Sequence, residues 1–416
     1  MANKTIAIVG AGASGLLCAI TAKRRLHEAG KNAQVIVYER NPRAGKKLLA
    51  TGNGRCNLTN MEQPLSAYHT DDIGTAAAVL GAFPVEDILQ FFEDIGLTCV
   101  QNGSLVYPRS MQAASVLDVL RFEAERLGVL FACGQEISAI RPESGVFRLS
   151  ASSGEVCRAN AVIIASGSEA SGGSAGGLSL LKSLGHKITP SYPALTPLRC
   201  DTTHIKTAAG MRANALLRLE IDGKAVHSEE GEVLFTDYGL SGIAVMQLSG
   251  AVSRLYASGK KHDVQIVLDL APEYDFSQVY ALLLRRRDIL RGQPLEQLLC
   301  GFLNKRVAMA ACKAADIGAL SIPIETCTDR QLKTLAALLK AWRIPVIGVK
   351  GAPSAQVMGG GAALNEFDAH TLASKKTKGV FACGEVLDIY GDCGGYNLTW
   401  AWASGFVAGR GAADSV

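Results

Sequence analysis

The chain has 416 residues, of which 48% are hydrophobic and 19% charged, a composition that excludes a largely disordered protein. Because a single hydrophobic core stops growing near about 250–300 residues, this length predicts at least two domains. Lys and Arg number 42 against 38 Asp and Glu, an excess too small to indicate a nucleic-acid or membrane partner.

The cysteines and histidines give no sign of a disulfide scaffold or a metal centre. The 11 cysteines are scattered and include no C-x-x-C pair, and the 7 histidines show no metal-ligand spacing. Reduced thiols in a cytoplasmic protein are the simplest interpretation. There is no run of about 20 apolar residues, so no membrane-spanning helix is predicted. The apolar run at 6–9 is too short for a signal peptide.

The N-terminal residues predict a strand–helix–strand unit. Ile6–Val9 is a short apolar run that ends at a glycine, which is typical of a buried parallel strand. The pattern G-x-G-x-x-G follows at Gly10, Gly12 and Gly15 and leads into an apolar stripe with helical spacing. The next strand, Val35–Glu39, ends in a carboxylate and completes one βαβ unit.

The rest of the chain divides at two proline-containing segments. Before the first, we expect a long loop over about 40–60, amphipathic helices over 86–95 and 113–127, short strands over 129–160 and a buried strand over 161–165. Prolines at 190, 193 and 197 mark a boundary, followed by strand patterns to 270 and helical patterns over 276–342. After Pro345 come glycine-rich loops, a short strand and a final apolar helix from 398 to about 409.

The glycine motif has the properties of a dinucleotide site. Gly10 allows a tight turn, Gly12 lets the backbone approach a pyrophosphate, and Gly15 lets helix and strand pack closely. The helix N-terminus then faces the negative charge of the phosphates. Glu39 accepts hydrogen bonds from a ribose and disfavours a 2′-phosphate, so this unit predicts FAD or NAD rather than NADP.

The C-terminal region favours FAD. Residues 383–385 end a strand in Gly-Glu, and Gly394-Gly395 precede a helix that starts near Asn397. A simple NAD dehydrogenase does not need this second element, whereas FAD is long and its flavin ring needs support of its own. The positive end of that helix favours the anionic reduced ring.

Two further segments belong to the same predicted site. The loop 45–60 is rich in glycine and amide side chains and follows the ribose-binding strand, so it is placed to wrap the pyrophosphate and flavin. The strand at 161–165 ends in Ser166-Gly167 at the edge of the sheet where ligands of open α/β folds bind. The residues predicted to contact FAD are Gly10, Gly12, Ala13, Ser14, Gly15, Glu39, Arg40, Lys47, Arg55, Cys56, Asn57, Ala165, Ser166, Gly167, Gly384, Glu385, Asn397, Leu398 and Ala401.

With these motifs the chain resembles the BaiN/YhiN-like NAD(P)/FAD-dependent oxidoreductases, also described as aminoacetone oxidase family flavoproteins. The segments that carry the resemblance are 8–16, 47–60, 165–186, 234–242 and 381–405. It implies an α/β, two-dinucleotide-binding-type (glutathione-reductase-like) FAD Rossmann domain with an inserted β-rich plus helical region. The expected FAD-binding domain is 1–189 with 346–416, and the inserted region is 190–345, β-rich to 270 and helical from 271. The resemblance also implies that the backbone of Ile137 meets the adenine.

Three functions are compatible with this sequence. The leading one is an FAD-dependent oxidoreductase that reduces a C=C bond of a small or medium apolar substrate, with NAD(P)H as a transient hydride donor. The first alternative is a flavin amine oxidase that produces peroxide. The second is a structural-flavin interaction protein, for which the basic run 285–287 is the only support. No catalytic residue is assigned, although Tyr107, Arg109 and Tyr396 are candidate proton donors. Neither nucleic acid nor membrane is expected as a partner, and the oligomeric state is left open.

Overall fold

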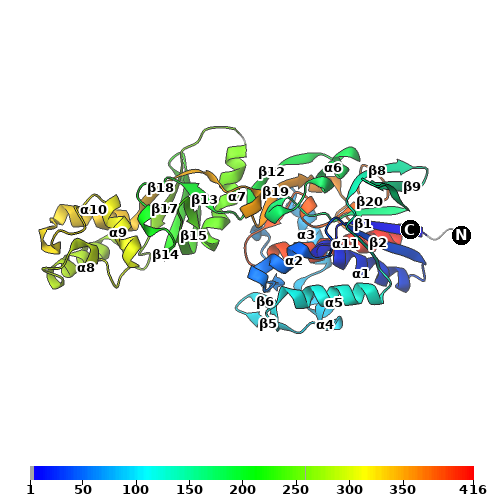
Figure 1. The fold of residues 1–416 in the computed structure, drawn as a ribbon, viewed down its shortest axis with the longest axis horizontal. Helices are drawn as coiled ribbons and strands as arrows, with labels where there is room; N and C mark the ends of the chain where they lie inside the picture. The colour runs from blue at the N-terminus through cyan, green and yellow to red at the C-terminus, as the bar shows by residue number, and fades with distance from the viewer. Residues whose placement is uncertain (1–3, 258) are drawn as a thin grey trace. The chain divides into compact units, whose positions relative to one another are not determined.

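The structure is a computed structural model that describes residues 4–257 and 259–416, and its chain forms two compact units (Figure 1). The first, here called the parallel-sheet unit, comprises Met1–Ser191 and Val357–Val416. The second, here called the barrel unit, comprises Tyr192–Gln356. Residues 346–356, which we expected in the FAD-binding domain, therefore belong to the inserted unit. The reason is that Pro345 does not mark the end of the inserted unit but lies inside a strand of the barrel, opposite Gln265.

A five-stranded parallel sheet forms the centre of the parallel-sheet unit. Its strands run in the order β20 (Val380–Ala382), β11 (Ala161–Ile164), β1 (Lys4–Val9), β2 (Ala33–Glu39) and β7 (Leu130–Cys133). The apolar residues of β1 and β11 are buried, as expected for strands covered on both faces. β1 lies between β11 and β2, so its carboxyl end is at the point where strand order reverses, the usual ligand position of this architecture.

Helices from the two ends of the chain pack against each other beside this sheet. They are α1 (Ala13–Glu28) and α11 (Tyr396–Ser415), which lie side by side in Figure 1. Glycines make this close contact possible. A Cβ placed on Gly405 would lie 2.5 Å from the carbonyl oxygen of Ser14, and one on Gly409 would lie 2.6 Å from that of Cys18.

Smaller elements complete the parallel-sheet unit. Its remaining helices are α2 (Lys46–Ala50), α3 (Ile73–Ala82), α4 (Val85–Asp94), α5 (Ala113–Arg126) and α6 (Gly176–Ser183). Its small sheets are β8 (Ile137–Glu143), β9 (Val146–Ala151) and β10 (Gly154–Ala159); β3 (Thr59–Asn60), β6 (Leu105–Pro108) and β5 (Cys99–Asn102); β4 (Tyr68–His69) with β21 (Tyr390–Gly391); and β12 (Ile188–Ala194) with β19 (Val357–Ala362). The helices predicted over 86–95 and 113–127 are confirmed. The expected loop over 40–60 instead contains α2 and a 3₁₀ turn, Thr51–Gly54.

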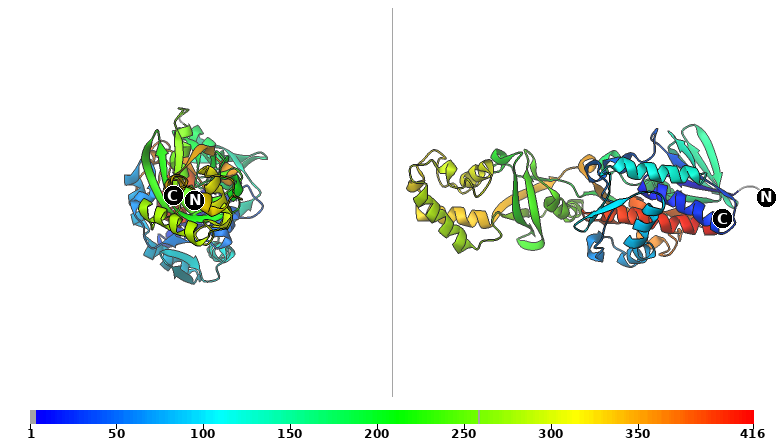
Figure 2. Two further views of the ribbon diagram at one scale, coloured as in Figure 1. Left: turned by 90° about the vertical axis from the view of Figure 1, so that its left-hand side faces the viewer. Right: turned by 90° about the horizontal axis from the view of Figure 1, so that it is seen from below.

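The barrel unit has a core of its own. Its closed barrel has the strand order β13 (Leu198–Cys200), β16 (Gly239–Ser241), β15 (Lys224–Phe235), β14 (Arg212–Ile221), β17 (Val264–Asp269) and β18 (Trp342–Val349). Helix α7 (Ile243–Ala257) packs on it, and the right-hand view of Figure 2 shows α8 (Phe276–Ile289), α9 (Lys305–Ala314) and α10 (Asp329–Lys340) grouped at one end. Within the insertion, most strands precede the helices α8, α9 and α10, whereas α7 lies among the strands and β18 follows the helices.

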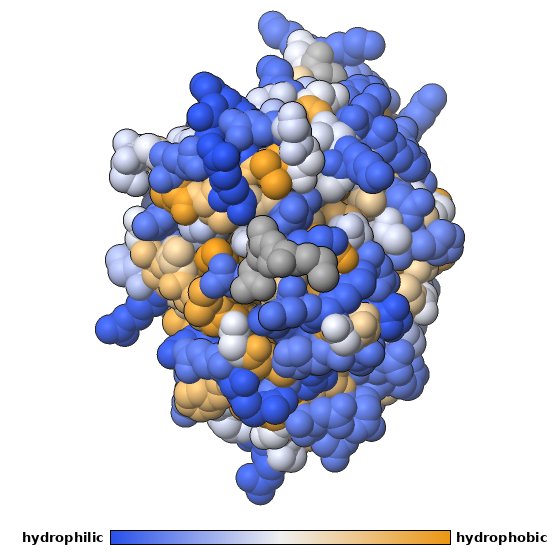
Figure 3. All heavy atoms as spheres, turned by 90° about the vertical axis from the view of Figure 1, so that its right-hand side faces the viewer, coloured by the Kyte–Doolittle hydropathy of each residue, from blue (hydrophilic) through white to orange (hydrophobic). Residues whose placement is uncertain are grey.

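The face of the molecule seen in Figure 3 is mainly hydrophilic, with apolar side chains in small groups. Within the described residues, no single helix has the length and apolar character to cross a membrane. The bent pair α3 and α4 meets that test by length and composition alone.

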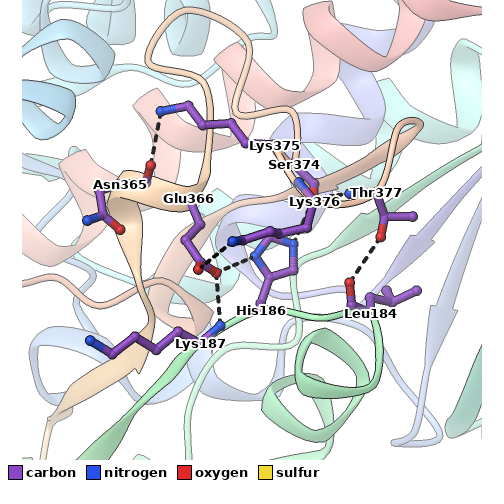
Figure 4. A network of polar contacts seen from close by, with 9 residues as sticks. All are labelled: Leu184, His186, Lys187, Asn365, Glu366, Ser374, Lys375, Lys376 and Thr377. Atoms are coloured by element: carbon purple, nitrogen blue, oxygen red, sulfur yellow. Dashed lines mark hydrogen bonds and ion pairs between the residues drawn. The ribbon is translucent and has the colours of Figure 1, made fainter.

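A buried histidine joins the loop after α6 to the segment that follows β19 (Figure 4). The Nδ1 of His186 lies 3.1 Å from the Glu366 carboxylate and its Nε2 lies 2.8 Å from the Ser374 hydroxyl. Its ring stacks on Phe367 at 4.5 Å. Burial lowers the pKa of His186. Burial alone would raise the pKa of Glu366, but the Lys187 amide and the other donors around the carboxylate hold it below its usual value.

These shifts predict how stability depends on pH. An unfolded chain takes up a proton at His186 near pH 6.5, whereas the folded protein resists it, so folding stability should fall as pH drops through that value. The loss for one proton is at most about 1.4 kcal/mol per pH unit. Thermal unfolding at pH 7.5 and 5.5 measures it. In H186Q the fall in folding stability between pH 7.5 and 5.5 should be smaller by the part that His186 causes. In the exposed control H370Q the fall should be as large as in the unmodified protein. An equal decrease in H186Q would contradict the assignment.

The contact between α1 and α11 gives a second prediction. G405A should lower the free energy of unfolding by about 1–3 kcal/mol, because the new methyl group meets backbone that cannot move aside. This loss should exceed the gain of about 1 kcal/mol that alanine brings to a helix. The matched control is G81A in α3, where an added Cβ meets nothing within 4 Å and stability should rise or stay the same. Denaturant unfolding of both variants measures the difference, and equal stabilities would contradict the packing argument.

Candidate flavin-binding site

The loop between β1 and α1 is shaped by three glycines with different tasks. Gly10 has φ 110°, and a Cβ there would lie 2.4 Å from the carbonyl oxygen of Ala165. A Cβ on Gly15 would lie 2.0 Å from the carbonyl oxygen of Gly10. By contrast, a Cβ on Gly12 would meet nothing within 4 Å. Gly10 and Gly15 are therefore needed for the protein's own packing, whereas Gly12 keeps a space open in front of the helix.

Neither α1 nor α11 has a side-chain cap at its N-terminus, and the same holds for α2, α4, α5 and α6 of this unit. Helix α1 begins after Gly12 and α11 begins after Gly395, and neither has a side chain bonded to its first amide groups. Gly395 has φ 100°, and a Cβ there would lie 2.6 Å from the backbone of Thr59. Uncapped N–H groups at the positive end of a helix form a binding site for negative charge. The long α11 is therefore held with its N-terminus against β3 and available to a ligand.

The carboxylate at the end of β2 is firmly oriented. Glu39 is 9% exposed, and its Oε2 accepts a hydrogen bond of 3.0 Å from the amide of Ala11. Its Oε1 accepts from the amide and the side chain of Asn41, at 2.8 and 2.6 Å. A carboxylate has about four acceptor positions, so it retains capacity for ribose hydroxyls. The neighbouring Arg40 donates to the carbonyl of Gly172 at 3.1 Å, and Ile137 is buried at the start of β8.

A polar cluster brings together residues from three distant segments. Lys47 forms an ion pair with Glu385, although 338 positions separate them in sequence. The hydroxyl of Ser168 donates to the same Glu385 oxygen at 2.9 Å. A Cβ on Gly384 would lie 2.4 Å from the Ser14 hydroxyl. The predicted contacts Ser14, Lys47, Gly384 and Glu385 therefore meet in one place, and the structure adds Ser168.

Helix α11 fixes the two loops that precede it. The amide of Gly384 donates to the Ser404 hydroxyl at 2.9 Å, and its carbonyl accepts from the Trp400 indole at 3.1 Å. The side chain of Asn397 bonds to both the amide and the carbonyl of Gly391, each at 2.7 Å. Asn397 therefore holds the turn that precedes the helix, while Leu398 and Ala401 lie in the first turns of α11.

Unsatisfied polar atoms mark the same site. Three buried side-chain oxygens have no hydrogen-bond partner within the described part of the chain, and two of them, on Asn57 and Ser166, belong to the predicted cofactor contacts. A buried polar atom without a partner costs about 1–3 kcal/mol, so a ligand that supplies the partner is favoured. Together with the open space at Gly12 and the N-termini of α1 and α11, which follow Gly12 and Gly395, these atoms fit a flavin dinucleotide.

Arg55 and Cys56 are adjacent predicted contacts that differ in burial. Arg55 is exposed, whereas Cys56 is fully buried with φ 59°, a conformation that non-glycine residues rarely adopt. Burial raises the pKa of the Cys56 thiol to about 12. A thiol in this state is a poor nucleophile, which argues against an electron relay through Cys56.

Sequence reasoning missed Ser168 and Trp400. Ser168 directly follows the Ser166-Gly167 pair, so extending that motif by one residue would have included it. Trp400 contributes through its indole to a backbone carbonyl, and an indole within an apolar helix gives no sequence signal that distinguishes it from core packing.

The fold and this site define the class of the protein, a flavoprotein oxidoreductase with a Rossmann-type domain. The chain belongs to the family described as "HI0933-like protein Rossmann domain", whose model matches residues 4–411. The expected fold class and the family resemblance are thereby confirmed.

Relatives match the chain over nearly its whole length. A 3-dehydro-bile acid delta(4,6)-reductase of Clostridium scindens is 36% identical over 98% of this chain and 99% of its own. A ribosomal RNA dihydrouridine synthase of Escherichia coli is 27% identical over 97% of this chain and 96% of its own. Among solved structures, a 3-ketosteroid delta1-dehydrogenase from Sterolibacterium denitrificans covers both chains completely at 10% identity and a TM-score of 0.51. That last similarity supports the fold alone.

The open space at Gly12 leads to a specific prediction. G12V should fold normally, because an added side chain meets no protein atom near its Cβ and φ of −81° suits any residue. The variant should nevertheless lose most of its flavin, since the valine occupies the space expected for the pyrophosphate. The visible absorbance of purified protein relative to total protein measures flavin content, and thermal unfolding verifies folding. G81V, at a similarly open position, is the control. A full flavin complement in G12V would refute the site.

Proposed function

We propose that this protein is an FAD-dependent reductase of a C=C bond conjugated to a carbonyl group, supplied with electrons by NAD(P)H. The observation that carries the proposal is the kind of bond shared by its full-length relatives. The name of the first places double bonds at positions 4 and 6 of a 3-oxo ring system. The product named for the second, dihydrouridine, is uridine with its C5–C6 bond saturated, next to the C4 carbonyl.

The residues of the parallel-sheet unit have distinct parts in holding FAD. The N-terminus of α1 binds the pyrophosphate through its amide groups, and Glu39 binds the adenosine ribose. The cluster of Lys47, Glu385 and Ser168 would hold the ribityl chain that joins the pyrophosphate to the flavin ring. Bound FAD supplies the capacity to accept a hydride from one molecule and deliver it to another. The N-terminus of α11 would stabilise negative charge on the reduced ring.

The substrate class is proposed to be a small or medium apolar enone. The higher identity to the bile acid reductase favours it. The second candidate is a uridine of ribosomal RNA, which the lower-identity relatives favour. The barrel unit contains the chain's whole excess of four positive charges. However, Arg286 and Arg287 donate to the backbone carbonyls of Leu298 and Cys327. Two of the three arginines of the basic run therefore serve the helical packing.

Anaerobic stopped-flow mixing tests the donor. We expect NADH or NADPH to bleach the visible absorbance of the flavin-loaded protein, because the proposed cycle begins with hydride transfer from a nicotinamide. The reduced protein is then mixed, still without oxygen, with a 3-oxo-4,6-diene steroid or with ribosomal RNA. The compound that restores the oxidised spectrum identifies the substrate class.

Three outcomes separate the alternatives. Recovery with the steroid supports the leading proposal, and recovery with RNA supports the second candidate. Absence of bleaching by both nucleotides, combined with peroxide formation from an amine such as aminoacetone, would overturn the reductase proposal in favour of an oxidase.

A further inference from the structure

A histidine–aspartate pair lies in the two-stranded ribbon that β4 forms with β21. His69 is the cross-strand partner of Tyr390, and their rings stack with centroids 4.6 Å apart and planes inclined by 23°. The Nε2 of His69 lies 2.7 Å from Oδ1 of Asp392. Neither residue of this pair belongs to the candidate flavin-binding site.

The ribbon is attached to the N-terminus of α11. The amide of Asp392 donates to the carbonyl of Ala67 at 2.9 Å, and its carbonyl accepts from the Asn397 side chain at 3.2 Å. On the other face of the ribbon, Tyr68 packs edge-to-face against Tyr396, with ring centroids 5.8 Å apart. The imidazole therefore sits on a ribbon whose position is fixed relative to the helix end that the proposed function assigns to the flavin.

The pair is buried enough to be ordered and exposed enough to exchange protons. The side chain of His69 is 38% exposed and that of Asp392 is 25% exposed. His186 differs, because its side chain is fully buried and both of its ring nitrogens have partners. His227 pairs with a carboxylate too, but within the barrel unit and far along the sequence from any cofactor segment. For His69, Nδ1 has no hydrogen-bond partner among the described residues, so one nitrogen is fixed and the other is available.

We propose that His69 is the proton donor of the reductase reaction and that Asp392 is its positioning residue. This inference rests on the proposed function. The β-carbon of the enone receives a hydride from the reduced flavin, and the α-carbon receives the proton carried by Nδ1 of the His69 imidazolium. The C=C π bond is replaced by two C–H bonds, the substrate gains two electrons, and the flavin is oxidised. His69, whose side chain is 38% exposed, recovers its proton from solvent, and NAD(P)H restores the flavin.

Separating the two half-reactions tests the inference. In H69Q, bleaching by NAD(P)H should stay within about twofold of the unmodified protein, because hydride arrival at the flavin needs no proton from this side chain. Recovery of the oxidised spectrum by the enone should slow by about 10²–10⁴-fold, the usual contribution of a general acid. The probe is whichever of the steroid and the RNA reoxidises the unmodified protein. H370Q, an exposed histidine of the same unit, is the matched control and should leave both rates unchanged.

Two measurements distinguish proton donation from a structural role. Added imidazole should restore part of the lost rate in H69A, which a purely structural defect would not allow. Nitrogen NMR of the histidine rings should show the neutral His69 protonated at Nε2, and D392N should mix the two tautomers, since the hydrogen-bond partner selects the tautomer. In D392N the enone step should slow less than in H69Q.

The outcomes also separate this inference from the proposed function. If the unmodified reduced protein is reoxidised by neither probe, the proposed function is overturned and this inference with it. If a probe reoxidises the unmodified protein and H69Q reacts at the same rate, this inference alone is overturned. A slowed H69A that imidazole does not rescue, with an unperturbed tautomer in D392N, would likewise overturn it.

Discussion

The site depends on the close packing of Gly384 and helix α11 against Ser14 in the first turn of α1, a contact here called the clamp. Ser14 is enclosed from two directions: a Cβ on Gly405 would lie 2.5 Å from its carbonyl oxygen, and one on Gly384 would lie 2.4 Å from its hydroxyl. Such approaches tolerate no side chain. Because the clamp joins residues near both ends of the chain, the candidate flavin-binding site is complete only after residues 357–416 have packed against the sheet.

This clamp also decides where charge is stabilised. Lys47 and Glu385 are paired with each other, and the N-termini of α1 and α11 add positive partial charge of their own. A helix end contributes up to about 2 kcal/mol to a nearby negative charge. For a two-electron couple that corresponds to roughly 40 mV. The helices therefore adjust the potential of a flavin, whereas the selectivity of the reaction has to come from groups that touch the substrate.

Local patterns predicted the strands of the parallel sheet well, because each strand pattern is contained in a few neighbouring residues. The glycine motif, Glu39 and the strand at 161–165 have the positions expected of them. The pairing of Lys47 with Glu385 could not be predicted, since it depends on tertiary contact between segments 338 positions apart. The boundary near Pro345 was wrong because a proline is tolerated at particular strand positions. The pair His69 and Asp392 has no motif and exists only through the pairing of two-residue strands.

The choice of proton donor compares His69 with the two neighbouring tyrosines, Tyr68 and Tyr396. Burial raises the pKa of the Tyr396 phenol, which makes it a weaker acid than an ordinary tyrosine. Burial likewise raises the pKa of the Tyr68 phenol. An imidazole is the side chain whose ordinary pKa lies in the physiological range. A donor must also take up a new proton in every cycle and keep its orientation. The side chain of His69 is 38% exposed, so solvent reaches it, and its Nε2 is held by Asp392. His69 therefore combines a usable proton with a fixed orientation, which neither tyrosine does.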